Sequence, residues 1–106
     1  MVKVVACMES ELGPGEMRNL SLMGRWILIA NVEGDIYAVD GLCPHQGANM
    51  ADGVLEGSVL RCPLHGAEYD IRTGKMVKGP WGGGTTASLR SYPVTVEEGC
   101  INIVIT

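Results

Sequence analysis

Short apolar runs separated by turn residues make up most of the chain and predict strands along its length. The first run, 2–8, is rich in β-branched residues, and the last, 101–105, has its isoleucines at alternate positions, as a half-buried strand should. The most apolar run, 25–32, shows no alternation, which predicts a central strand covered on both faces. Further strands are expected at 17–22, 35–40, 67–72, 75–77 and 91–96, with a short hairpin over 54–61.

Turn residues connect these strands as hairpins. Glu33-Gly34 joins 25–32 to 35–40, Glu56-Gly57 lies at the centre of the 54–61 hairpin, and 97–99 precedes the last strand. No window shows a helical period with caps, and 78–85 is irregular and rich in glycine. The predicted fold class is therefore all-β, in a single domain covering 1–106.

Two similar motifs carry the candidate chemistry. The first motif is Cys43-Pro44-His45 and the second is Cys62-Pro63-Leu64-His65, with sixteen residues between His45 and Cys62. The two motifs contain both histidines and two of the four cysteines, and each follows a predicted hairpin that would hold it rigidly. Two thiolates and two imidazoles are sufficient to hold a metal centre, with one residue of each kind on each loop.

A zinc site and a catalytic pair are both less consistent with the order of these residues. A Cys2His2 zinc site uses the same ligands, but it usually has two cysteines close together and then two histidines. A catalytic Cys–His pair would leave the duplication of Cys-Pro and His-x-Gly unexplained. Four unrelated structural residues are the remaining alternative.

The paired motif resembles the Rieske [2Fe–2S] family, and the 89–94 ending also resembles small Rieske ferredoxins. The resemblance implies three stacked antiparallel sheets, in which a base made from the chain ends carries an inserted cluster-binding subdomain at about 41–82. It also implies one [2Fe–2S] cluster, with Cys43 and Cys62 on the buried iron and His45 and His65 on the outer iron. The positions expected around the cluster are Gln46, Gly47, Leu64, Gly66, Ala67, Tyr69, Pro80 and Trp81.

The chain departs from the membrane-bound Rieske proteins at three positions. Ala48 and Leu64 replace the second cysteine of each loop, so the disulfide of that branch cannot form, and Ala67 replaces a serine that donates to a cluster sulfur. Tyr69 matches a tyrosine that donates to a ligand sulfur. By resemblance, these departures imply the low-potential branch without a membrane anchor.

Charge and composition limit the class of partner. The formal charge of −4 and the 5% aromatic content argue against binding to nucleic acid or an anionic membrane. No run is long enough to span a bilayer, and the first apolar run is too short for a secretory signal, so we expect a cytoplasmic monomer. Cys7 and Cys100 could be neighbours if the terminal strands pair; free thiols are favoured over a disulfide.

The resemblance implies a one-electron carrier rather than an enzyme. The expected partners are a flavin-dependent reductase as donor and a terminal oxygenase as acceptor, commonly one acting on aromatic substrates. The chain has no glycine fingerprint for a dinucleotide and no histidine beyond the two motifs. The alternative is the small Rieske subunit of an assimilatory nitrite reductase, which has a similar length and motif.

Overall fold

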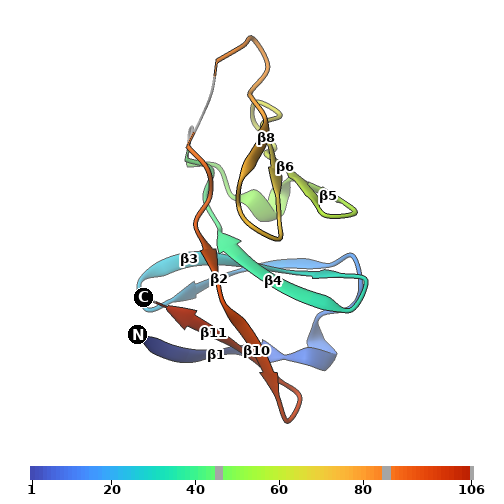
Figure 1. Cartoon of the computed structure of the whole chain (residues 1–106), viewed down its shortest axis with the longest axis vertical. Coiled ribbons are helices and arrows are strands. Elements are labelled where there is room, and N and C mark those ends of the chain that lie inside the picture. The colour runs from blue at the N-terminus through green and yellow to red at the C-terminus, as the bar shows by residue number, and fades with distance from the viewer. Residues whose placement is uncertain (45–46, 85–86, 106) are drawn as a thin grey trace.

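Three antiparallel sheets are stacked along the longest axis of the molecule (Figure 1). The computed structural model describes residues 1–44, 47–84 and 87–105. The lower sheet has the order β1 (Val2–Met8), β11 (Cys100–Ile105), β10 (Val94–Glu97). The middle sheet has the order β2 (Met17–Leu22), β3 (Arg25–Val32), β4 (Asp35–Asp40), β9 (Ser91–Tyr92).

The upper sheet is built from three-residue strands. Its order is β5 (Val54–Glu56), β6 (Val59–Arg61), β7 (Glu68–Asp70), β8 (Met76–Lys78). Two 3-10 turns, η1 (Glu9–Glu11) and η2 (Met50–Asp52), lie in connections. The all-β prediction with three antiparallel sheets is confirmed. The boundaries at about 41 and 82 enclose the upper sheet and stay a prediction.

Strand β3 separates two hydrophobic cores. Leu28 and Ala30 belong to the core shared with the upper sheet, whereas Ile27 and Ile29 belong to the core shared with the lower sheet. Each of these four side chains is fully buried. The prediction of a central strand covered on both faces is therefore confirmed, and its continuous apolar pattern reflects its place between two layers.

The predicted strand over 91–96 is wrong as a single element. Pro93 divides it into β9, which pairs with β4 in the middle sheet, and β10, which pairs with β11 in the lower sheet. Proline has no N–H for a sheet ladder and a fixed φ, so the chain changes sheets at this residue. The expected strand over 67–72 is likewise shorter, because Ile71 and Arg72 begin a turn.

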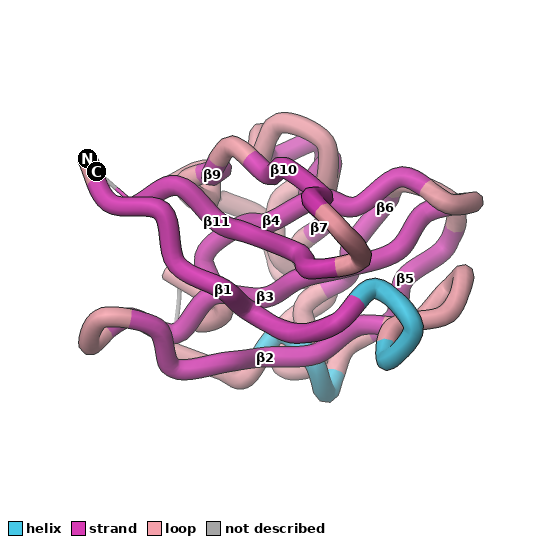
Figure 2. The backbone as a smooth tube through the Cα atoms, turned by 90° about the horizontal axis from the view of Figure 1, so that it is seen from below, coloured by secondary structure: helices cyan, strands magenta, loops and turns pink. Residues whose placement is uncertain are grey.

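The two chain ends lie side by side, as Figure 2 shows from below. Val2 is opposite Ile105, and the pairing continues to Met8 opposite Cys100. Cys7 is opposite Ile101, one register position from Cys100, and the structure records both thiols as free. Among the described residues, no helix is long and apolar enough to cross a membrane.

Candidate metal centre

The first ligand loop leaves the middle sheet at the end of β4 and is closed by its own backbone. The N–H of Cys43 donates to the carbonyl of Ala48 at 2.8 Å, and the N–H of Gly47 donates to the carbonyl of Cys43 at 2.7 Å. Gly47 has a φ of 70°, a left-handed conformation that strains residues with a Cβ. The result is a tight loop with the Cys43 side chain buried at its base.

The second ligand loop leaves β6 and repeats this hydrogen-bond pattern. The N–H of Cys62 donates to the carbonyl of Ala67 at 2.8 Å, and the N–H of Gly66 donates to the carbonyl of Cys62 at 3.2 Å. Gly66 has a φ of 72°, close to that of Gly47. The sequence motif therefore corresponds to two equivalent backbone loops, which explains why the glycine occurs at the same distance after each cysteine.

The two loops bring their cysteine sulfurs together. Cys43 and Cys62 are each 2% exposed, and their thiols lie within hydrogen-bonding reach of each other. Burial raises the pKa of the Cys62 thiol, the neighbouring Cys43 adds to this, and backbone N–H groups of Leu64 and His65 act in the opposite direction by donating to the Cys62 sulfur. A thiolate here is thus stabilised by donors from its own loop.

A tyrosine lies behind the first cysteine. The hydroxyl oxygen of Tyr69, from β7, lies 3.8 Å from the sulfur of Cys43, and Tyr69 is fully buried. This position is compatible with the expected donation to a ligand sulfur, since a phenol can donate to a thiolate.

The loop after β8, which contains Pro80 and Trp81, lies against the second ligand loop. The N–H of Trp81 donates to the carbonyl of His65 at 2.6 Å, and the Trp81 indole lies so close to Gly66 that a Cβ there would collide with the ring. Trp81 is nevertheless 63% exposed and Leu64 is 49% exposed, whereas Pro80 is buried. Trp81 and Leu64 therefore present apolar surface beside His65.

Two predicted positions, His45 and Gln46, lie outside the described residues. Within 1–44, 47–84 and 87–105, no three or more side chains of His, Cys, Asp or Glu gather to hold a single metal ion. A Rieske cluster needs only two protein side chains on each of its two irons, so it does not require a group of three around one ion.

The sequence motifs do not indicate the residues that attach the first ligand loop to the middle sheet. The side-chain amide of Asn19 on β2 donates to the carbonyl of Gly41 at 2.8 Å and to the Asn49 side chain at 2.9 Å. Gly41 and Asn49 are the two roots of the loop, and Leu42 bridges to Asn49. A Cβ on Gly41 would collide with Asn19. No local sequence signal links Asn19 to a loop more than twenty residues away.

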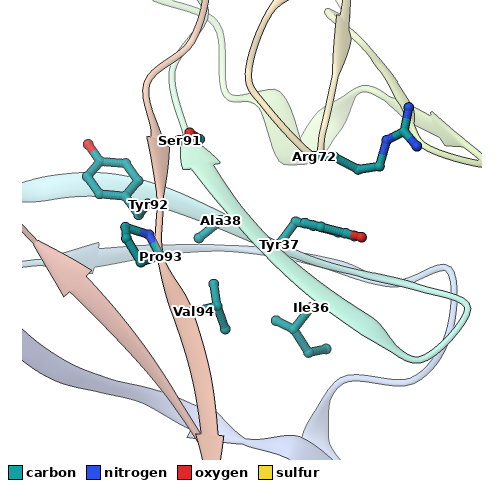
Figure 3. Close-up of a pocket in the computed structure, with 8 residues that line it drawn as sticks. All are labelled: Ile36, Tyr37, Ala38, Arg72, Ser91, Tyr92, Pro93 and Val94. Atoms are coloured by element: carbon teal, nitrogen blue, oxygen red, sulfur yellow. The ribbon is translucent and has the colours of Figure 1, made fainter.

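A groove beside the middle sheet contains no cysteine or histidine among its lining residues. It has a volume of about 430 Å³ and is lined by β4, β9, the start of β10 and Arg72. Figure 3 shows Tyr37 and Ile36 on opposite sides of β4, with Arg72 near Tyr37. The Arg72 guanidinium forms two bonds of 3.0 Å to Asp70, and this partner lowers the pKa of the Asp70 carboxyl. The Arg72 cation is thus already paired.

Comparison with known proteins identifies the family. Residues 2–93 match the Rieske [2Fe–2S] domain. The ferredoxin component of the naphthalene 1,2-dioxygenase system of Pseudomonas putida is 39% identical over 89 residues, which are 84% of this chain and 82% of that protein. The chain therefore belongs to the Rieske [2Fe–2S] family.

Solved structures support the same assignment. The Sphingomonas yanoikuyae B1 ferredoxin is 28% identical with a TM-score of 0.86, covering 99% of this chain and 100% of that one. A ferredoxin–oxygenase complex of carbazole 1,9a-dioxygenase is 28% identical with a TM-score of 0.82, covering 95% and 91%. These relatives are electron carriers, and the cofactor of this chain is one Rieske-type [2Fe–2S] cluster. The paired, buried thiols of Cys43 and Cys62 and the N–H donors around them fit such a cluster.

Proposed function

We propose that this protein is the ferredoxin component of a multicomponent oxygenase that acts on aromatic compounds. The observation that carries the proposal is that two buried cysteine sulfurs, one from each of two equivalent loops, lie within hydrogen-bonding reach of each other. Its support from comparison is the likeness to ferredoxins of dioxygenase systems and to a ferredoxin–oxygenase complex. The nitrite reductase alternative has no such support among these relatives.

Four residues are proposed as ligands: Cys43 and Cys62 on one iron, His45 and His65 on the other. When bound, the cluster accepts and gives up one electron. The cysteines hold it from the buried side, where the donors from Leu64 and His65 offset the thiolate charge. The chain itself carries out no bond chemistry; it positions a redox centre and excludes water from its cysteine side.

We propose that partners approach over His65, Trp81 and Leu64, with His45 and Gln46 contributing. Electron transfer needs a short distance, and the cysteine side is covered by the core formed with the middle and upper sheets. The exposed apolar side chains of Trp81 and Leu64 can be desolvated at little cost. The donor is proposed to be a flavin-dependent reductase and the acceptor a terminal oxygenase, with a monomer working in the cytoplasm.

The test is rapid mixing of the reduced protein with an oxidised terminal oxygenase. The oxygenases of the naphthalene 1,2-dioxygenase and carbazole 1,9a-dioxygenase systems are suitable probes, because their ferredoxins resemble this chain. We expect at least one to oxidise the protein in a second-order reaction. If neither accepts electrons while a nitrite reductase large subunit forms a stable complex with the protein, the proposal is wrong.

A further inference from the structure

A second groove lies directly beside the first ligand loop, at the junction of that loop with the middle sheet. It has a volume of about 450 Å³, and its lining includes Cys43 itself. We call it the flank groove; besides Cys43, its lining residues are Arg25, Trp26, Asp40, Leu42, Pro44, Arg90 and Tyr92. Trp26 is 48% exposed and Leu42 is 41% exposed, so the groove combines accessible apolar surface with two guanidinium groups.

Within the described part of the chain, neither arginine of the flank groove forms an ion pair. Among the described residues, Lys3, Arg61 and Arg72 each have a carboxylate within 4.0 Å, whereas Arg25 and Arg90 have none. One terminal nitrogen of Arg25, Nη1, is buried and has no hydrogen-bond partner among the described residues.

The one carboxylate in the groove is occupied by other donors. Asp40 accepts from the hydroxyl of Tyr92 at 2.7 Å and from the backbone N–H of Arg90 at 2.8 Å. Arg25 in turn lies within hydrogen-bonding reach of the Tyr92 hydroxyl. Arg25 and Arg90 therefore give the groove a net positive charge with donors left over, in a protein whose formal charge is −4.

The groove beside the second ligand loop differs in its charge. A groove of about 290 Å³ beside the second ligand loop is lined by Asp52, Arg61 and Trp81, among others. Its arginine is paired with both Glu56 and Glu68, so it offers no uncompensated cation. The ligand loops themselves, 41–51 and 62–67, contain no charged residue. Of the two grooves, only the flank groove thus offers arginines without an ion-pair partner among the described residues.

We propose that the flank groove binds a carboxylate side chain flanked by apolar residues on the surface of the terminal oxygenase, and so sets the orientation of the docked complex. This inference rests on the proposed function, because a partner seated over His65 must lie beside one of the two flanks. The arginines match a carboxylate in geometry and charge, and Trp26, Leu42 and Pro44 match its apolar neighbours. Charge at such a rim acts mainly on the association rate and its dependence on salt.

The test compares two charge reversals of equal size. Arg90→Glu places a negative charge at the groove, while Lys75→Glu makes the same change at an exposed turn between β7 and β8, where Lys75 has no ion pair among the described residues. The measurements are the second-order rate of electron transfer to the oxygenase that accepts electrons from the wild-type protein, the dissociation constant by titration calorimetry, and the cluster potential of each variant.

We expect Arg90→Glu to lower the transfer rate about tenfold at low salt and to weaken binding, with an unchanged potential. Added salt should slow the wild-type reaction and speed that of the variant, because screening removes an attraction in one and a repulsion in the other. Trp26→Ala should weaken binding without altering the salt dependence. Lys75→Glu should change the transfer rate and the dissociation constant by no more than about twofold.

Equal effects of the two reversals, or a wild-type rate that does not respond to salt, would overturn the flank groove as a docking site. A loss that appears with the reductase and not with the oxygenase would assign the groove to the donor and overturn the proposal as made. If no oxygenase accepts electrons from the wild-type protein, the proposed function fails first and this inference falls with it. A changed potential in Arg90→Glu would mean that the residue acts on the cluster and not on the partner.

Discussion

Two regions of the molecule differ in how their strands and loops are stabilised. We call the lower and middle sheets the base, and the upper sheet with the two ligand loops the cluster region. In the base, the longer strands have six to eight residues and pair in long registers, with isoleucine and leucine filling the core between them. In the upper sheet the strands have three residues each, and the two ligand loops are closed by backbone hydrogen bonds and by glycines with positive φ. Both regions bury a hydrophobic core, but the region around the candidate centre depends in addition on specific backbone geometry.

Charge is divided in the same way. The turns of the base carry acidic side chains, whereas the ligand loops carry no charge at all. The acidic residues in these connections or at the strand ends beside them include Glu9, Glu11, Glu33, Asp35, Glu97 and Glu98. The base therefore presents charged turns to solvent, whereas the ligand loops present an uncharged surface.

The largest effect is expected from the proposed ligands. Cys62→Ser should abolish the cluster and reduce iron from about two atoms per chain to near zero, because one iron loses a thiolate that serine does not replace well. Iron analysis and the visible spectrum measure this. Cys7→Ser and Cys100→Ser in the lower sheet are the matched controls and should keep full iron. Iron loss in either control would mean that the ligand set is wrong.

A core truncation in the base should lower the free energy of unfolding without changing the cluster potential. Ile103 is fully buried between the lower and middle sheets, so Ile103→Ala should lower the free energy of unfolding by about 2–5 kcal/mol. Denaturant unfolding gives the value, and Val96→Ala, a truncation at a position 41% exposed on the same sheet, should cost much less. The cluster potential should not change in either variant. A shifted potential would show that the two regions are not independent.

In the cluster region, adding a single methyl group to Gly66 should also lower the free energy of unfolding, because of backbone strain and a steric collision. Gly66→Ala introduces a Cβ into a residue with a φ of 72° and into the Trp81 indole. Gly57→Ala has the same kind of strain, with a φ of 59°, but no atom within 4 Å of the new Cβ. Gly66→Ala should cost about 1–3 kcal/mol more than Gly57→Ala in urea unfolding.

The Trp81 contact can be checked in the same experiment. Adding Trp81→Ala to Gly66→Ala should recover most of the extra cost, because the colliding ring is gone. Equal costs for the two glycine variants would place the indole elsewhere.

A smaller effect is expected from Ala67, which is 1% exposed beside Cys62. Ala67→Ser would add a hydroxyl able to donate to a cluster sulfur, and such a bond strengthens as that sulfur gains charge on reduction. If about 1 kcal/mol of a charged hydrogen bond differs between redox states, the potential rises by roughly 40 mV. Protein-film voltammetry at a pH where both ligand histidines stay protonated measures it, with Ala6→Ser in β1 as control. An unchanged or lower potential with an intact cluster would show that residue 67 does not face the sulfide.

The smallest effect is expected at the base. Glu98→Lys reverses a charge on the β10–β11 turn, at the end of the molecule opposite the ligand loops (Figure 1). It should change the rate of electron transfer to the oxygenase little, because exposed charges separated by more than about 8–10 Å are largely screened at physiological salt. A strong slowing, with none from Arg90→Glu, would move the docking surface to the base.

Sequence pattern predicts the base better than the cluster region. The bounds of β1 to β4 follow from apolar runs and Gly-containing turns, since long strands carry enough residues to show their period. The effect of Pro93 is underestimated by the pattern because it depends on which sheet each half of the run joins. The ligand loops are predicted from their motif alone. Asn19 could not be predicted, because its role depends on a contact between β2 and a loop that only the folded chain brings together.

We propose that two cysteines and two histidines of this chain hold a two-iron cluster. The chain has only two histidines, so growth with ¹⁵N-histidine labels His45 and His65 alone. Pulsed EPR of the reduced protein should then show hyperfine coupling from two histidine nitrogens, and replacement of either histidine should remove one of them. A paramagnetic cluster without histidine coupling, or a colourless protein that contains zinc, would contradict the account.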